Sequence, residues 1–233
     1  MDTDKPKRKY WKFVAGFLAM IFLAFGVVIA LRVHETSKLA KEQEIKILLS
    51  RLTEAVNLME SVKAEMSQEL LEVHEFSVKQ IQENKLKLYQ IHTKLEGQQL
   101  VMYHGVKSKS IYVNPSINLR AEIWIPIFYH EAGHLYWHSQ YPVENFEEFQ
   151  KQLYASEEHS YAVDAQAWNM VKKHFPVEKE KLNQDELGLF NIYEEETSLY
   201  NGMIEGDSEA KAKWNAVIEE DIRLQKEQQE LLQ

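Results

Sequence analysis

Residues 13–31 run for 19 positions, from Phe13 to Leu31, without a charged side chain. As an α-helix at about 1.5 Å per residue, this run would reach about 28 Å, close to the thickness of the hydrocarbon core of a bilayer. The tail 1–12 carries five Lys or Arg against two Asp, and positively charged flanks stay on the cytoplasmic side. We therefore expect a single-pass transmembrane helix in the cell membrane, with an N-terminal cytoplasmic tail at 1–12 and an extracytoplasmic C-terminal domain.

A cleaved signal peptide is the alternative, since Val28, Ile29 and Ala30 form a passable cleavage site. Signal peptides typically have an apolar core of about 7–15 residues, and this run is longer. The length favours a retained anchor.

Residues 32–98 contain no Pro and a single Gly, Gly97. Apolar residues alternate in steps of three and four at Ile45, Leu48, Leu52, Ala55, Met59, Val62 and Met66. Such a heptad pattern predicts a helical coiled-coil stalk, and the slip in its phase near Leu70 and Val73 indicates a break. Two arrangements fit: a homodimeric stalk, or a helical hairpin that folds back on itself or on the C-terminal domain.

The chain has no Cys and a formal net charge of -9. The absence of Cys excludes disulfides, thiolate metal sites and a Cys nucleophile. The acidic balance argues against a nucleic-acid partner, because contact with phosphates needs a basic face. A metal ion in this chain would have to be held by His and carboxylate side chains.

Residues 99–233 are expected to form the folded domain. Ile111, Tyr112 and Val113 lie between turn-forming residues and predict an edge strand or small hairpin. Helical patterns dominate the remainder, which becomes strongly acidic from Glu178 onward. The fold class that we expect is α+β, mostly helical, preceded by the stalk and the transmembrane helix.

The chemistry is concentrated in His130-Glu131-Ala132-Gly133-His134. On a helix, residues four apart lie on one face, so both histidines can direct a ring nitrogen at one metal ion. Glu131 would project beside that ion, where a carboxylate can take a proton from bound water. Gly133 leaves room for another element to approach, and Pro126 fits the first turn of the helix.

This motif matches that of the zincin metallopeptidases, and a strand followed by the motif helix is similar to their minimal fold. The resemblance covers about residues 100–175. It implies that His130 and His134 bind zinc and that Glu131 acts as general base on zinc-bound water during peptide hydrolysis. The domain at 99–233 would then be a compact, gluzincin-like zincin domain, in which a Glu from a later helix is the third ligand.

Ser156 is a plausible N-cap for that later helix. We expect Glu158 to be the third metal ligand, because it aligns with Ala162 and Ala165, whose small side chains would allow close helix packing. Glu157, Asp164 and His159 are the alternatives, and Asp164 could instead hold a ligand His through its other nitrogen. His138 lies one turn beyond His134 and cannot converge on the same ion, so we expect it beside the site or on the surface.

The expected function is that of a membrane-anchored zinc metallopeptidase that acts on a protein or peptide substrate outside the cytoplasm. The alternative is a non-catalytic, membrane-tethered coiled-coil interaction protein with a degenerate zincin-like domain. Tyr193 and Tyr200 are candidates for stabilising an oxyanion, although the sequence selects neither.

Overall fold

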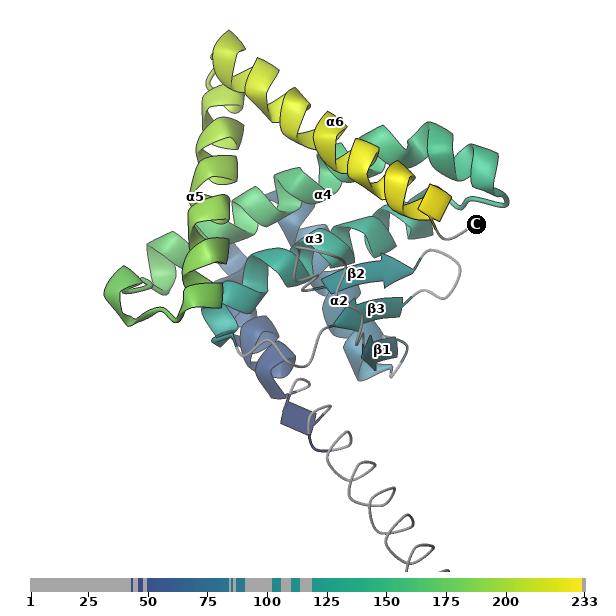
Figure 1. Ribbon diagram of the computed structural model, residues 1–233. Helices are drawn as coiled ribbons and strands as arrows, with labels where there is room; N and C mark the ends of the chain where they lie inside the picture. Colours follow the sequence, from purple (N-terminus) through teal and green to yellow (C-terminus); the bar gives the residue numbers. More distant parts are fainter. Residues whose placement is uncertain are drawn as a thin grey trace, which may run out of the picture. The chain divides into compact units, whose positions relative to one another are not determined.

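The structure is a computed structural model that describes residues 50–83, 87–90, 102–105, 110–113 and 119–231, with 43, 46, 47 and 85. A helical segment at 50–61 comes first. The elements that follow are η1 (Lys63–Glu65), α2 (Gln68–Gln82), β1 (Lys87–Gln90), β2 (Met102–Gly105), β3 (Ser110–Val113), α3 (Ala121–Gln140), α4 (Phe146–His174), η2 (Lys179–Lys181), α5 (Gln184–Ile204) and α6 (Ser208–Leu231) (Figure 1).

Helices α3 and α4 form the centre of the fold. Helix α4 contacts α2, α3, α5 and α6, whereas α3 contacts α2, α4, α5 and the strands β2 and β3. A helix that is covered on several sides has to be apolar around most of its circumference. Accordingly, Ile123, Trp124, Ile125, Phe128 and Tyr129 of α3 are all buried.

The strands form a small sheet in the order β1-β3-β2. Strand β1 pairs with β3 in parallel, and β2 pairs with β3 in antiparallel orientation. Each strand has four residues, and Ile111 of β3 is fully buried in the main core. The sheet is thus an addition to a helical framework rather than one of its layers.

Helix α3 begins at Ala121, so Pro126 lies inside the helix and not in the first turn where we expected it. Proline lacks the N–H that would bond the carbonyl four residues earlier. In the same turn, the hydroxyl of Tyr193 on α5 donates to the carbonyl of Ile123 at 3.3 Å. A side chain from α5 thus bonds the backbone of α3 close to the proline.

The predicted fold class, an α+β domain carried by a separate coiled-coil stalk, is wrong. Residues 50–82 do not stand apart as a stalk: Leu52, Ala55 and Met59 of the heptad pattern are buried in the same core as Trp124 and Phe128. The apolar stripe therefore packs on the C-terminal domain, as in the hairpin alternative. The result is a predominantly helical fold.

The transmembrane helix predicted for residues 13–31 lies outside the described residues. Within the part of the chain that the structure describes, no helix has the length and apolar character needed to cross a membrane.

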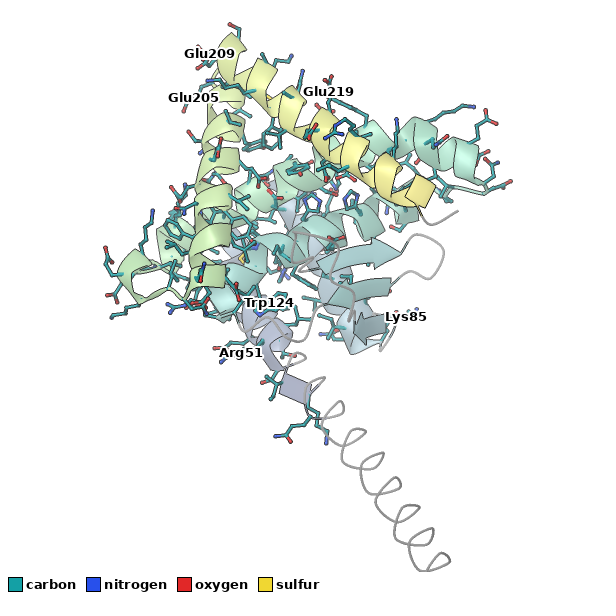
Figure 2. The ribbon with its side chains drawn as sticks, in the orientation of Figure 1. Arg51, Lys85, Trp124, Glu205, Glu209 and Glu219 are labelled. Atoms are coloured by element: carbon teal, nitrogen blue, oxygen red, sulfur yellow. The ribbon has the colours of Figure 1, made fainter. Side chains whose placement is uncertain are left out.

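Helices α5 and α6 form a V-shaped pair, and their turn carries the exposed Glu205 and Glu209 (Figure 2). Gly206 in this turn has φ of 92°, a left-handed conformation that glycine adopts without strain. Trp214 and Ile218 of α6 are buried in a second apolar cluster that α6 shares with α4. This cluster fixes α6 against the helix that carries half of the candidate site.

We expect Met59→Ala to lower the free energy of unfolding of the whole domain by about 2–5 kcal/mol, because it opens a cavity in the core. Met59 is fully buried, whereas Asn57 two residues earlier is exposed. Asn57→Ala is the matched control and should change stability by less than about 0.5 kcal/mol. Urea unfolding followed by tryptophan fluorescence measures both, and equal stability of the two variants would mean that this segment does not belong to the core.

Candidate metal site

The candidate site lies between α3 and α4, which run antiparallel. His130 contacts Asp164, whereas His134, one turn later on α3, contacts Ser156, two turns earlier on α4. Gly133 permits this packing, since a Cβ built there would lie 3.0 Å from Ser160 Oγ and 3.2 Å from Ser160 Cα. The expectation that Gly133 marks a close approach of another element is confirmed.

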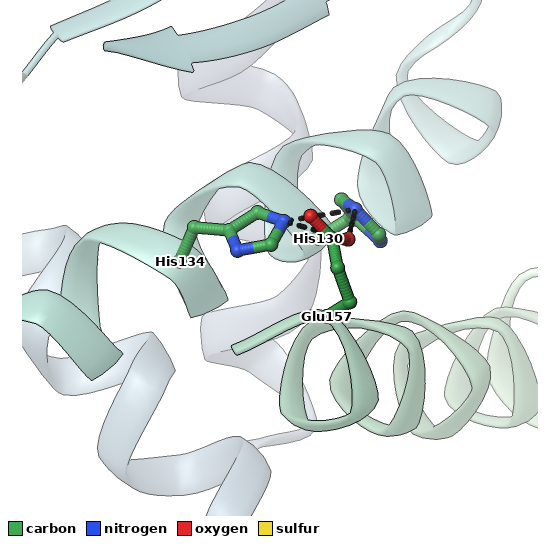
Figure 3. Close-up of side chains that lie close together, drawn as sticks. All are labelled: His130, His134 and Glu157. Carbon is green, nitrogen blue, oxygen red and sulfur yellow. Dashed lines mark hydrogen bonds and ion pairs between the residues drawn. The ribbon is translucent and has the colours of Figure 1, made fainter. Parts of the chain in front are cut away.

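Three side chains converge across this contact: His130, His134 and Glu157 (Figure 3). The two Nε2 atoms are 3.2 Å apart. Glu157 Oε2 lies 3.2 Å from Nε2 of His134 and 3.6 Å from Nε2 of His130. Two imidazole nitrogens and one carboxylate oxygen thus come within the distance over which three ligands share one metal ion.

The other ring nitrogen of each histidine, Nδ1, also has a hydrogen-bond partner. Asp164 Oδ2 lies 2.9 Å from Nδ1 of His130, and Ser156 Oγ lies 2.8 Å from Nδ1 of His134. A partner at Nδ1 fixes the orientation of the ring and directs Nε2 at the cluster. Both rings are therefore oriented by α4, the helix that also supplies Glu157.

Glu157 is completely buried. Burial by itself would raise the pKa of its carboxyl group, but the charges and hydrogen bonds of His134 and His130 outweigh this effect and hold the pKa well below its usual value. Burial would likewise lower the pKa of His130, yet its bonds to Asp164 and Glu157 raise the pKa well above the usual value. The site therefore favours a carboxylate at Glu157 and a proton on His130 in the absence of a metal ion.

Further acidic side chains surround this centre. Burial raises the pKa of Asp164 to about 6, against the lowering effect of its bond to His130. Burial also raises the pKa of Glu196 on α5 well above its usual value, and the negative charges of Asp164 and Asp221 add to this rise. The acidic C-terminal part thus contributes carboxyl groups from α5 and α6 to the surroundings of the site.

Glu131 follows His130 directly on α3 and is 8 % exposed. Its negative charge is one of the effects that raise the pKa of His130, after the bonds to Asp164 and Glu157. Glu131 lies outside the three-residue cluster. A general base on metal-bound water has to lie near the metal ligands without being one of them.

Glu158, the predicted third ligand, is exposed and lies outside the cluster, where Glu157 occupies the position expected of it. The physical reason is the phase of α4. Helix α4 begins at Phe146 with Asn145 as its N-cap, eleven residues before the predicted N-cap, and Ser156 bonds His134 instead of capping. Glu157 shares the inward face with Ser160 and Asp164, whereas Glu158 points to solvent.

The other histidines near the motif face elsewhere. Nδ1 of His159 lies 2.9 Å from Glu69 Oε1 on α2. The ring of His138 lies beside Phe149, with 5.7 Å between centroids, and is not part of the cluster.

Tyr161, which the sequence analysis does not single out, packs against a residue of the site. Its ring meets that of His130 edge-on, with centroids 4.8 Å apart and an interplanar angle of 84°. Tyr193 and Tyr200, the tyrosines proposed from the sequence, bond the Ile123 carbonyl and Gln166 respectively. The spacing of Tyr161, four residues after Glu157, could have indicated its place once Glu157 was known as the inward residue.

Comparison with known proteins yields no match: no protein-family model, no curated protein and no solved structure is similar to this chain. The interpretation of the site therefore depends on its residues and geometry.

We expect Gly133→Ala to destabilise the protein, although alanine favours helices by about 1 kcal/mol over glycine. The added methyl group would press on the backbone of Ser160, and overpacking of a core contact costs about 1–3 kcal/mol. Gly188→Ala is the control, because that glycine also lies inside a helix but a Cβ there meets nothing within 4 Å. Thermal unfolding should show a lower Tm for the first variant and an unchanged or higher Tm for the second; a higher Tm for both would contradict the close approach.

We expect a divalent metal ion to displace about one proton from the site at neutral pH. His130, whose pKa is raised above the usual 6.5, has to lose its proton before Nε2 can bind the ion. The affinity for the metal ion should therefore rise with pH, by up to about tenfold per pH unit, until the pH exceeds the raised pKa of His130. Calorimetric titration with Zn²⁺ in buffers of different ionisation enthalpy counts the protons. Glu158→Gln should release the same number, and binding without proton release would contradict the assignment.

Proposed function

We propose that this protein is a zinc-dependent metallopeptidase in which His130, His134 and Glu157 hold the ion. The observation that carries the proposal is the spacing of the three donor atoms. Tetrahedral zinc with bonds of about 2.0–2.1 Å places its ligand atoms about 3.3 Å apart. The distances between the donors here are 3.2, 3.2 and 3.6 Å.

The chemistry of the donors fits zinc as well. Catalytic zinc sites commonly have three protein ligands of the His and carboxylate type and an open fourth position. A fully buried carboxylate such as Glu157 is costly without a positive partner, and a divalent cation would supply that charge when His130 is neutral. The side chain of His130 is 17 % exposed, so the cluster is not fully closed off from solvent.

The residues around the cluster have separate roles in this proposal. A bound zinc ion supplies a Lewis acid that polarises a carbonyl group and lowers the pKa of water to about 7. Glu131 accepts the proton of the attacking water and passes it to the amine that leaves. Asp164 and Ser156 keep the two imidazole rings in the orientation and tautomer that this chemistry needs.

The choice of peptide bonds as substrate is supported by the similarity of His130-Glu131-Ala132-Gly133-His134 to the zincin motif. The order along the chain agrees with it, because a Glu from the next helix completes the cluster. The rival function, a non-catalytic interaction protein, would not require a Glu directly after His130 that stays outside the cluster.

We expect the purified protein to bind about one zinc ion per chain and to cleave a casein-derived peptide mixture. Glu131→Gln should keep the zinc and lose hydrolysis by about 10²–10⁴-fold, because the general base is not a ligand. Glu157→Ala should lose zinc affinity, whereas Glu158→Ala, which removes the exposed neighbour, should change neither property. Metal analysis and mass spectrometry of the products measure both.

The outcomes separate the two functions. A wild-type protein that stays free of zinc in metal-replete medium would refute the metallopeptidase. Zinc binding without hydrolysis of any peptide would favour the interaction protein.

A further inference from the structure

One ridge of α4 carries Glu157 between apolar neighbours. Residues four apart lie on the same face of a helix, so Leu153 and Tyr161 stand one turn before and one turn after Glu157. Leu153 is buried in the second apolar cluster, which joins α4 to α6, and Tyr161 packs against that cluster (Figure 1). The apolar residues on both sides of Glu157 therefore belong to the surface on which α6 packs.

Helix α6 contacts this ridge on both sides of Glu157. The rings of Trp214 and Tyr161 have centroids 6.0 Å apart. The other buried members of the second cluster are Leu153 and Ala165 of α4 and Ile218 and Ile222 of α6. Ala165 lies about 18 Å from Leu153 along α4, so Leu153 joins the cluster through α6. Leu153 and Tyr161 are about 12 Å apart, and a helix with its side chains is about 10–12 Å wide, so a helix that contacts both lies over Glu157.

The exposure of the three cluster residues agrees with a cover on this side. The side chain of Glu157 has no exposure, that of His134 is 2 % exposed and that of His130 is 17 % exposed. Water needs only a narrow path to such a site. A peptide needs more room, because its backbone has to lie over the metal ion before a carbonyl group can be polarised.

The far part of α6 is attached to the domain less firmly than the turn from which it starts. None of its side chains that the structure describes belongs to the main core. Nε1 of Trp214 is buried and has no hydrogen-bond partner in the described part of the chain, which disfavours the packed position. At the turn, by contrast, a Cβ built at Gly202 of α5 would lie 2.8 Å from Cβ of Ala210. Helix α6 can therefore pivot about this turn while the main core stays intact.

We propose that α6 is a lid over the candidate metal site: the structure shows it closed, and a peptide reaches the cluster only after α6 has moved away from the ridge that carries Glu157. The inference rests on the proposed peptidase function and adds a regulatory step to it. Lids of this kind set the rate of many enzymes, since the open state has to form before the substrate binds. A partner that binds only the open position of α6 would raise activity by shifting this population.

The chain has no Cys, so a single introduced Cys reports the opening of α6 directly. Ala165 and Ala167 are both buried on α4, but Ala165 lies in the second cluster and Ala167 in the main core. We expect a thiol reagent to label Ala165→Cys at least about 10²-fold faster than Ala167→Cys, because only global unfolding exposes the main core. Adding Ile218→Ala, which loosens the second cluster, should accelerate the labelling of Ala165→Cys alone.

Equal labelling rates for the two cysteines overturn the inference, and so does an Ile218→Ala substitution that leaves the labelling of Ala165→Cys unchanged. If Ala165→Cys does not fold, Leu153→Cys takes its place, since it adds no volume to the second cluster.

Peptide cleavage separates the lid from the proposed function. We expect Ile218→Ala in the zinc-loaded full chain to raise kcat/KM for a casein-derived peptide at least about tenfold, because more molecules are open. Ile204→Ala on α5 is the matched control and should leave kcat/KM unchanged, since Ile204 is exposed. If the wild type cleaves peptides and Ile218→Ala does not cleave them faster, the lid is overturned. If neither cleaves peptides but Ala165→Cys is labelled selectively, the lid is supported and the peptidase assignment alone fails.

Discussion

The close approach of α3 to α4 at Gly133 and Ser160 is the contact on which the site depends. A side chain larger than hydrogen at Gly133 would hold the helices apart. The donor atoms of Glu157 and of the two histidines lie 3.2–3.6 Å apart, so a separation of the helices by one further ångström would open the cluster. The same approach brings Ser156 to Nδ1 of His134 and Asp164 to Nδ1 of His130. One glycine thus determines whether α3 and α4 come close enough to form the cluster.

Polar contacts fix α3 on its other side as well. The buried His74 of α2 accepts or donates at both ring nitrogens, 2.5 Å from the hydroxyl of Tyr129 and 2.6 Å from Glu60 Oε2. Tyr129 directly precedes His130 in the chain. A buried polar group without a partner is costly, so this chain of contacts specifies one orientation of α3 rather than only adding stability. A helix that is apolar around most of its circumference could otherwise rotate between similar packings, and its two histidines would lose their common direction.

The motif on α3 could be predicted from the sequence because helical spacing alone places His130 and His134 on one face. The third residue of the cluster could not. Glu157 and Glu158 are adjacent, and the choice between them depends on the rotation of α4 about its axis. The sequence placed the start of this helix at Ser156 rather than at Phe146, and it gave no means of determining that rotation.

The heptad pattern at 45–66 was ambiguous in a different way. A stripe at steps of three and four buries a helix equally well against a partner chain or against its own domain, and here Leu52, Ala55 and Met59 pack within the domain.

The functional unit therefore begins well before residue 99, the expected start of the domain. Residues from Leu48 to Gln233 form one compact unit. A fragment that started at residue 99 would lack the helical segment 50–61 and α2, and would leave part of the apolar surface around Trp124 and Phe128 uncovered. It would also lack His74 and Glu60, the partners that hold Tyr129. Because α3 carries both part of the core surface and the two histidines of the cluster, the helices before it contribute to the site through the packing of α3.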